Sequence, residues 1–206
     1  MNIVPQSHEW ITPFNRDVVL SRIEQIARTC YKSENAIKPG SAEKMVAMLC
    51  KNQHYAMIEH VSMTCKFITD RGVANEIVRH RIASYAQEST RYCNYSKDKF
   101  GNELTFIDHG YNGELGRVWM DACYKAEECY FAMLKAGATP EQARDVLPLC
   151  LKTEIVCTWN LREWHEVLRL RTAPDAHPAI RNLMIPVLRE LQEVYPEIFN
   201  DIEVEE

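Results

Sequence analysis

The ten residues HVSMTCKFIT, at positions 60–69, are the stretch that decides the fold class most clearly. From position 61 to position 67 every second residue is apolar, namely Val61, Met63, Cys65 and Phe67. An alternation with a period of two is typical of a β-strand that buries one face. Apolar residues then recur at helical spacing, at Val73, Ala74, Ile77 and Val78. We therefore predict a half-buried strand that leads through a turn into a helix.

A second alternating stretch, Leu151 to Trp159, predicts another strand, whereas most other segments have helical spacing. The expected helices are 17–30, one from the N-cap Ser41 onward, 115–136 with Leu115 and Val118 on its apolar stripe, 140–146, 161–171 after the N-cap Asn160, and one from the cap Asp175 to about 194. Residues 96–113 are polar and read as irregular. These elements predict the α+β class: one domain over residues 1–206, with a small, mainly antiparallel sheet and several helices.

Composition and charge exclude several classes of protein. The 206 residues carry a formal net charge of −5, whereas a broad nucleic-acid interface usually makes a domain basic. The chain has no apolar run long enough for a transmembrane helix, and residues 1–8 lack the pattern of a secretory signal. The eight cysteines include no Cys-x-x-Cys pair, which favours reduced thiols over disulfides or zinc. We expect a cytoplasmic protein that uses no metal, nucleic acid or membrane.

Positive charge is concentrated in one short segment of this acidic chain. Arg79-His80-Arg81 is followed closely by Gln87-Glu88-Ser89-Thr90-Arg91-Tyr92. The planar fork of arginine suits phosphate oxygens, so a local cluster predicts a small anionic ligand such as a mononucleotide or a dinucleotide pyrophosphate. The chain has no Gly-x-Gly-x-x-Gly and no P-loop motif, so side chains would have to bind such a ligand. Positive neighbours should also keep His80 neutral.

The same residues have ordinary structural explanations. A single arginine more often pairs with a surface glutamate, and Glu166 and Arg169 are spaced for pairing along a helix. His80 could equally be a partly buried histidine bonded to the backbone, and Asn160 a simple N-cap. Two other functions also remain open at this point: an RNA-binding protein, and a nucleotide-binding protein or nucleotide hydrolase that uses the arginine cluster.

The order of the motifs resembles the flavin-dependent thymidylate synthase family, which carries Arg-His-Arg, seven residues and then Ser. Here Arg79-His80-Arg81 is followed by seven residues and Ser89. Further blocks match the family in the same order, namely His54, Glu59-His60, Arg144-Asp145-Val146-Leu147-Pro148, Asn160-Leu161-Arg162 and Leu170-Arg171. The matching blocks span residues 54–171, which makes the resemblance far more specific than one short motif.

The resemblance implies an enzyme that converts dUMP to dTMP by reductive methylation. Methylenetetrahydrofolate would supply the carbon, and NADPH would reduce the FAD cofactor. The resemblance also implies a homotetramer with FAD held between subunits.

By motif position, the resemblance also assigns residues to ligands. The dUMP set is Glu76, Ile77, Val78, Arg79, Gln87, Glu88, Ser89, Thr90, Arg91, Arg144 and Arg171. The FAD set is Ala56, Arg79, His80, Arg81, Gln87, Asn160, Leu161, Arg162 and Glu166. His54 would lie near the flavin and the folate. Arg171 would be catalytic, because a guanidinium beside the uracil stabilises negative charge that develops on the ring.

Two positions depart from the family pattern. Glu166 stands where the family usually has His or Asn, and His165 precedes it directly, so either side chain could meet the flavin. Ala56 has no polar side chain and would offer FAD only its backbone or its methyl group.

Overall fold

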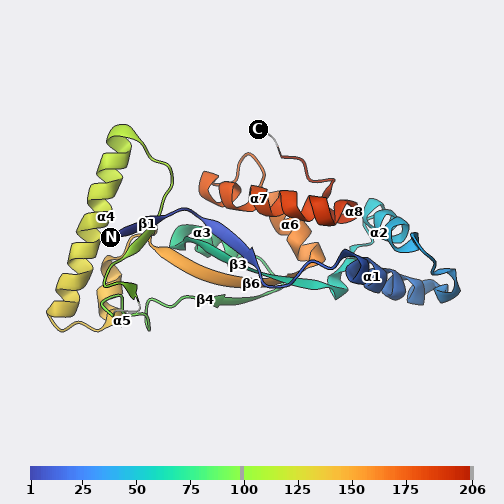
Figure 1. Cartoon of the computed structure of the whole chain (residues 1–206), viewed down its shortest axis with the longest axis horizontal. Coiled ribbons are helices and arrows are strands. Elements are labelled where there is room, and N and C mark those ends of the chain that lie inside the picture. Colours follow the sequence, from blue (N-terminus) through green and yellow to red (C-terminus); the bar gives the residue numbers. More distant parts are fainter. Residues whose placement is uncertain (98–99, 205–206) are drawn as a thin grey trace. The chain divides into compact units, whose positions relative to one another are not determined.

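The computed structural model describes residues 1–97 and 100–204, and its larger sheet has four strands (Figure 1). The strand order is β2-β3-β6-β4, with the bounds Ser7–Trp10, Ser62–Asp70, Lys152–Asn160 and Ala83–Gln87. Both alternating stretches are confirmed as strands, because they form the neighbours β3 and β6. The edge strands β2 and β4 were not expected from the sequence.

The neighbouring strands of this sheet run antiparallel. Leu161 donates its backbone N–H to the carbonyl of Val61 at 2.9 Å, whereas Arg71 donates to the carbonyl of Leu151 at 3.2 Å. The residue numbers of the bonded partners therefore increase along β3 and decrease along β6, which is the antiparallel arrangement. For the pair of β2 with β3, the bonds from Ile11 N to Thr64 O and from Thr69 Oγ1 to Gln6 Oε1 show the same arrangement. For the pair of β4 with β6, the bonds are from Glu88 N to Glu154 O and from Trp159 Nε1 to Tyr85 Oη.

Each central strand continues directly into a helix with a polar cap. Helix α3 (Arg71–Ile77) follows β3, and the Asp70 carboxylate accepts a hydrogen bond from Val73 N at 2.6 Å. Helix α6 (Leu161–Arg171) follows β6, and the side chain of Asn160 accepts from Glu163 N at 2.8 Å. These bonds satisfy N–H groups that a helix start leaves unpaired. The predicted N-cap Asn160 is confirmed.

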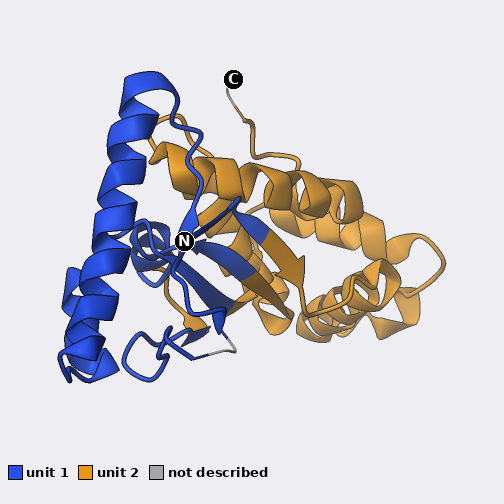
Figure 2. Cartoon of the chain, turned by 60° about the vertical axis from the view of Figure 1, so that its left-hand side comes forward, with its two compact units in different colours: residues 1–7, 67–79, 86–156 blue, residues 8–66, 80–85, 157–206 orange. Residues whose placement is uncertain are grey.

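The chain divides into two compact units, shown in different colours in Figure 2. Unit 1 contains residues 1–7, 67–79 and 86–156, and unit 2 contains residues 8–66, 80–85 and 157–206. Each unit includes part of all four strands of the larger sheet. A single domain over residues 1–206 stays a prediction.

Unit 1 packs a long helix and a short parallel strand pair around its own core. Strand β1 (Asn2–Val4) pairs in parallel with β5 (Thr105–Ile107). The helices are α4 (Gly113–Lys135) and α5 (Pro140–Ala143), and a 3-10 turn follows at Arg144–Val146. One cluster of buried residues in this core consists of Tyr95, Leu104, Phe106, Cys123, Tyr130, Ala143 and Leu151.

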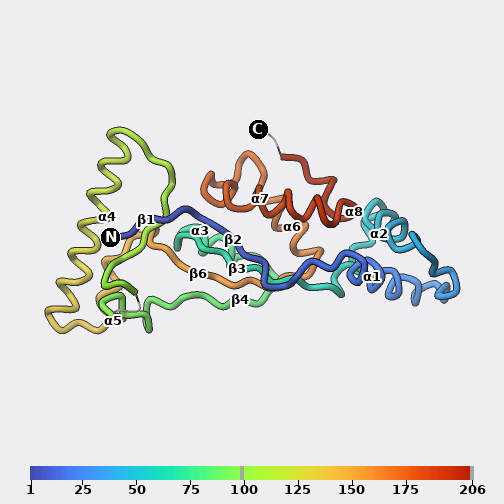
Figure 3. The backbone as a smooth tube through the Cα atoms, in the orientation of Figure 1, coloured from blue at the N-terminus to red at the C-terminus, as the bar shows by residue number. Residues whose placement is uncertain are grey.

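Unit 2 consists mainly of helices and 3-10 turns. Their bounds are α1 (Arg16–Tyr31), a 3-10 turn at Glu34–Ala36, α2 (Ser41–Lys51), a 3-10 helix at Tyr55–His60, α6, α7 (Pro178–Val194) and α8 (Pro196–Phe199), and Figure 3 traces the chain through them. The Trp164 ring lies 4.9 Å from that of Trp10 and 4.5 Å from that of Trp159, centre to centre. Trp164 also donates its N–H to Met63 O at 3.1 Å, which ties α6 to β3.

Two predicted helix caps were wrong. Gly40 caps α2 with a φ of +76°, and Ser41 lies inside the helix, where its hydroxyl donates to Lys38 O at 2.7 Å. His177, not Asp175, caps α7, because its ring accepts a hydrogen bond from Ala179 N at 3.2 Å.

Two features of unit 1 also differ from expectation. The stretch 96–113 contains β5, although residues 98–99 lie outside the described part. Helix α4 was expected to bury its stripe, but Leu115 and Val118 are 61% and 53% exposed in the chain. No helix among the described residues combines the length and the apolar character that crossing a membrane requires.

Candidate functional site

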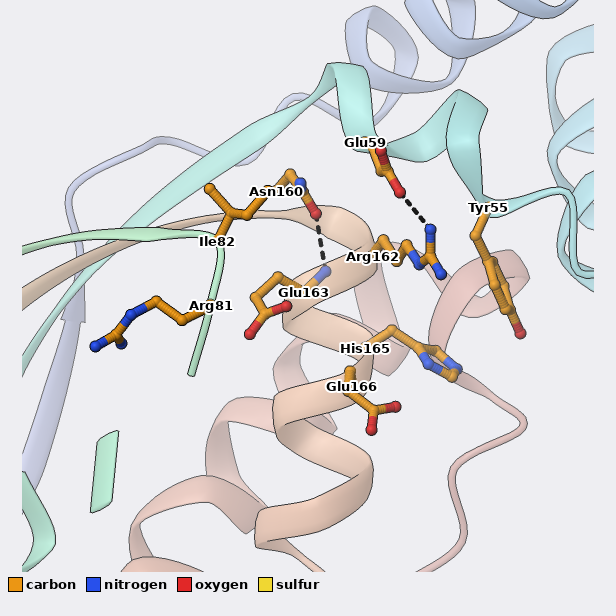
Figure 4. A pocket seen from close by; sticks show the side chains of 9 residues that line it. All are labelled: Tyr55, Glu59, Arg81, Ile82, Asn160, Arg162, Glu163, His165 and Glu166. Atoms are coloured by element: carbon orange, nitrogen blue, oxygen red, sulfur yellow. Dashed lines mark hydrogen bonds and ion pairs between the residues drawn. The ribbon is translucent and has the colours of Figure 1, made fainter. Parts of the chain in front are cut away.

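A polar cavity of about 390 Å³ in unit 2 contains several of the residues predicted to bind FAD (Figure 4). Helix α6 supplies much of its wall, because successive turns of the helix present Arg162, Glu163 and Glu166. The complete lining is Tyr55, Glu59, Arg81, Ile82, Asn160, Arg162, Glu163, His165 and Glu166. The structure thus brings the predicted Arg81, Asn160, Arg162 and Glu166 to one cavity. Leu161 is buried and does not line it.

Two of the three carboxylates that line this cavity have arginine partners. Arg162 forms an ion pair with Glu59, and both side chains are exposed. Arg169 donates to Glu166 at 2.7 Å, and this bond holds the pKa of the Glu166 carboxyl below its usual value. The predicted pairing of Glu166 with Arg169 is therefore confirmed. The pKa of Glu163 is raised, because burial disfavours its charged form and the charge of Glu166 adds to that effect.

His165 and Glu166 both line the cavity but have different partners. His165 is buried, and its Nε2 lies 2.9 Å from the carboxylate of Asp201. Its ring packs against Tyr55 at 5.5 Å and Phe199 at 6.2 Å, centre to centre. His165 therefore serves the packing of unit 2, whereas Glu166 is partly exposed. Which of the two meets a flavin stays a prediction.

His80 is one of the buried residues of the predicted site. Its side chain is 8% exposed, and its Nε2 accepts a hydrogen bond from Arg171 Nε at 2.9 Å. The opposite ring nitrogen, Nδ1, lies 3.8 Å from Glu163 Oε1. Burial and then the charge of Arg171 lower the pKa of His80 to about 4. The expected neutral state is thus confirmed, but its main causes are burial and Arg171 instead of the flanking arginines.

The backbone of His80 is fixed as well as its ring. Its carbonyl accepts a hydrogen bond from Tyr85 Oη at 2.9 Å and another from Arg81 Nη1 at 2.8 Å. Trp159 Nε1 in turn donates to Tyr85 Oη at 3.1 Å. Tyr85 and Glu163 were not among the predicted functional residues. The alternation in β4 is too short to reveal Tyr85, and Glu163 was expected only as part of a helix cap.

The predicted positions His54 and Ala56 lie at a different cavity of unit 2. This second cavity has a volume of about 330 Å³ and is mostly apolar. Its lining residues are Ala27, Cys30, Tyr31, Leu49, His54, Ala56 and Met57. Among the residues assigned to FAD, Ala56 is thus at the second cavity, whereas His80 and Leu161 line neither cavity.

In unit 1, the predicted dUMP residues come from three short segments. Glu76 and Ile77 end α3 and Val78 and Arg79 follow it, Gln87 to Arg91 end and follow β4, and Arg144 begins the 3-10 turn after α5. Ile77 is fully buried, so only its backbone could reach a ligand, whereas the side chain of Arg79 is exposed. Thr90 is also buried.

The side chains of Glu88 and Gln87 have structural partners in unit 1. Glu88 accepts hydrogen bonds from Tyr95 Oη at 2.9 Å and from Lys152 Nζ at 3.2 Å. Gln87 donates to Thr153 Oγ1 at 3.3 Å. These bonds hold the end of β4 in place, immediately before the Ser89 turn.

The segment Ser89 to Arg91 forms a tight turn in which Thr90 is buried and Arg91 is exposed. Arg91 N donates to Ser89 Oγ at 3.3 Å, and Cys93 N donates to Ser89 O at 2.9 Å. The half-exposed guanidinium of Arg91 lies 3.3 Å from Glu141 on α5. Among the residues that the structure describes, no carboxylate pairs with Arg79 or with Arg144, and both are exposed.

Comparison with known proteins gives consistent results. The family model described as "Thymidylate synthase complementing protein" matches residues 18–197. A flavin-dependent thymidylate synthase from Geobacter sulfurreducens is 33% identical over 182 residues, which cover 85% of this chain and 78% of the relative. One from Mycobacterium tuberculosis is 28% identical over 221 residues, which cover 98% and 86%.

Two solved structures share the fold. A UMP/dUMP methylase, PolB, from Streptomyces cacaoi, bound with 5-Br dUMP, has a TM-score of 0.78 at 22% identity and covers 97% of this chain and 96% of that one. Thymidylate synthase X from Helicobacter pylori, with FAD and dUMP, has a TM-score of 0.75 at 19% identity and covers 96% and 98%. These likenesses confirm the α+β fold class.

Proposed function

Because this chain belongs to the family of flavin-dependent thymidylate synthases, we propose that it converts dUMP to dTMP by reductive methylation. FAD is the cofactor, methylenetetrahydrofolate supplies the carbon, and NADPH supplies the reducing equivalents. The observation that carries the proposal is the bond between Arg171 and the neutral His80. This bond holds the Arg171 guanidinium against His80, the middle residue of the family's Arg-His-Arg motif.

The polar cavity of unit 2 has residues that suit part of a dinucleotide cofactor. Its volume of about 390 Å³ lies within the range of small-molecule sites. The guanidiniums of Arg81 and Arg162 offer planar donors to phosphate oxygens, and Tyr55 offers an aromatic ring. Bound FAD supplies the transfer of reducing equivalents, for which amino-acid side chains are poor agents.

Arg171 is the group that we assign to the uracil ring. A guanidinium at the carbonyl edge of the ring favours negative charge on that edge when the ring nitrogen loses its proton. Because His80 already holds the Arg171 side chain, little reorganisation accompanies the appearance of this charge. This is the role of a preorganised electrostatic group, and no cysteine nucleophile is needed.

Residues of unit 1 are assigned to the 5′-phosphate of dUMP. The Ser89 to Arg91 turn offers a hydroxyl and a guanidinium, and Arg79 and Arg144 are exposed cations without carboxylate partners in the described residues. A charge-assisted hydrogen bond contributes roughly 1.5–3 kcal/mol. A few such bonds suffice to hold a mononucleotide against water.

We further propose a cytoplasmic homotetramer that binds FAD between its subunits. This arrangement is supported by the location of Ala56 at a different cavity of unit 2 from Arg81, Arg162 and Glu166. If one FAD molecule contacts residues of two subunits, those residues can lie at different cavities of a single chain.

The test is a reconstitution of the purified protein with FAD. We expect a yellow protein that forms dTMP, measured by chromatography, from dUMP, methylenetetrahydrofolate and NADPH, and that forms none when one component is omitted. Failure to bind FAD would contradict the proposal. Tight, salt-dependent binding of RNA or Mg²⁺-dependent release of phosphate, in place of dTMP, would support the alternatives.

A further inference from the structure

We infer that His80 is a positioning residue, whose neutral imidazole holds the Arg171 guanidinium in the orientation that the uracil requires. This inference rests on the proposed function and changes the expected role of His80, which motif position assigns to FAD. It follows from contacts within unit 2, where the ring of His80 lies between Arg171 and Glu163.

The direction of the hydrogen bond determines where the proton of His80 lies. The guanidinium of Arg171 can only donate, so His80 Nε2 accepts the bond of 2.9 Å and carries no hydrogen. A neutral imidazole has a single N–H, which must then be on Nδ1. That nitrogen lies 3.8 Å from Glu163 Oε1, which is near a carboxylate but beyond hydrogen-bond distance. Both ring nitrogens therefore lie near side chains of α6, Nε2 at Arg171 and Nδ1 at Glu163.

The surroundings of His80 preserve this tautomer. The imidazole is buried, and its ring meets the edge of Trp159 at 6.2 Å between centres. The carbonyl of His80 accepts bonds from Tyr85 and Arg81, so the backbone that carries the ring is fixed.

Arg171 benefits from such a partner because of its place in the fold. It is the last residue of α6, where a long side chain has many rotamers. A positioned acceptor selects among them before the substrate arrives, which is the general way that a neighbouring residue improves a catalytic group. His80 therefore affects turnover through Arg171, without a substrate contact of its own.

Two near-isosteric substitutions separate this role from a contact with FAD. In His80→Gln, the amide oxygen can occupy the position of Nε2 and still accept from Arg171, whereas the shorter amide of His80→Asn reaches only the position of Nδ1. His80→Phe keeps the ring shape without an acceptor. We expect kcat for dTMP formation to stay within about fivefold of wild type in the Gln variant. It should fall by about 100-fold in the Asn and Phe variants.

The remaining readouts exclude a general structural effect. FAD content and KM for dUMP should change little in all three variants, because the loss lies in the orientation of Arg171. His109→Gln and His109→Phe serve as matched controls, since His109 is a partly buried histidine paired with Asp70 at 2.8 Å in unit 1 and belongs to no proposed site. These controls should keep the wild-type kcat.

Nuclear magnetic resonance distinguishes failure of this inference from failure of the proposed function. The Arg171 Nε–H signal, assigned by its loss in Arg171→Lys, should be protected from exchange in wild type and in His80→Gln and unprotected in His80→Phe. If wild type forms no dTMP, the proposed function is wrong and this signal alone decides the inference. A Phe variant with wild-type kcat or a protected signal, or a Gln variant that loses kcat as strongly as Phe, would overturn the inference.

Discussion

The arginines assigned to the substrate are held differently in the two units. In unit 1, Arg79 and Arg144 are exposed without carboxylate partners in the described part of the chain, and Arg91 has one half-exposed contact with Glu141. In unit 2, Arg171 donates to a buried, neutral imidazole whose own backbone is fixed. Exposed cations suit the capture of an anion that orders them on binding. A guanidinium fixed in advance suits charge that appears only during the reaction.

Removal of the Arg171 guanidinium should have the largest effect on the reaction. In Arg171→Ala, we expect kcat for dTMP formation to fall by roughly 10²–10³-fold, the usual loss for one preorganised donor at a developing charge. FAD content, read from visible absorbance, should stay near that of wild type. Loss of FAD in proportion to kcat would contradict the separation of roles.

Removal of the exposed cations should have a smaller effect on a different constant. In Arg91→Ala and in Arg144→Ala, KM for dUMP should rise by about 10- to 100-fold, because one charge-assisted bond contributes roughly 1.5–3 kcal/mol. The value of kcat should change much less. Arg117→Ala is a matched control, since Arg117 is an exposed arginine of α4 that pairs with Glu114 and Asp121. A KM that rises equally in this control would show a general charge effect.

The buried histidine also predicts how stability depends on pH. Because the folded pKa of His80 is about 4 and the unfolded value is near 6.5, only the unfolded chain binds this proton between those values. The free energy of unfolding should therefore be unaffected by His80 above about pH 6.5 and decrease as the pH falls through this window. Urea unfolding of wild type and His80→Gln from pH 7 to pH 4 measures the difference. Identical pH slopes in both proteins would show that the pKa of His80 in the folded chain equals its value in the unfolded chain, against this account.

The smallest expected effect concerns the exposed ion pair at the cavity of unit 2. The pair of Glu59 with Arg162 lies in solvent, where such pairs contribute about 0–1 kcal/mol. Glu59→Gln should thus change the free energy of unfolding, measured by urea titration, by less than ~1 kcal/mol. It should also leave Arg162 free to bind FAD as well as or slightly better than before. A large loss of FAD affinity would show that Glu59 itself binds the cofactor.

The central strands could be predicted from the sequence, whereas the edge strands could not. Strands β3 and β6 alternate over nine residues each, and every second side chain is buried, so the period is visible. Strands β2, β4 and β5 have four, five and three residues, which is too short for a period. They form by pairing with segments distant in sequence, which no local pattern encodes.

In the candidate site, too, local features could be predicted from the sequence, whereas contacts between distant residues could not. Local patterns placed the Arg-His-Arg motif after a helix and Asn160 at a helix start, and the spacing of Glu166 and Arg169 predicted their pairing. The bond between His80 and Arg171 joins residues 91 positions apart, so only the folded chain reveals it. For the same reason, the neutral state of His80 was predicted from its neighbours in sequence, although burial and Arg171 are its main causes.

The contrast between the two units is tested most directly by the affinities of dUMP and of deoxyuridine, which lacks the phosphate. Calorimetric titration of FAD-loaded wild type should show much tighter binding of dUMP. The double variant Arg91→Ala/Arg144→Ala should lose most of that preference, and Arg171→Ala should keep it. A preference that survives in the double variant and disappears in Arg171→Ala would contradict the account.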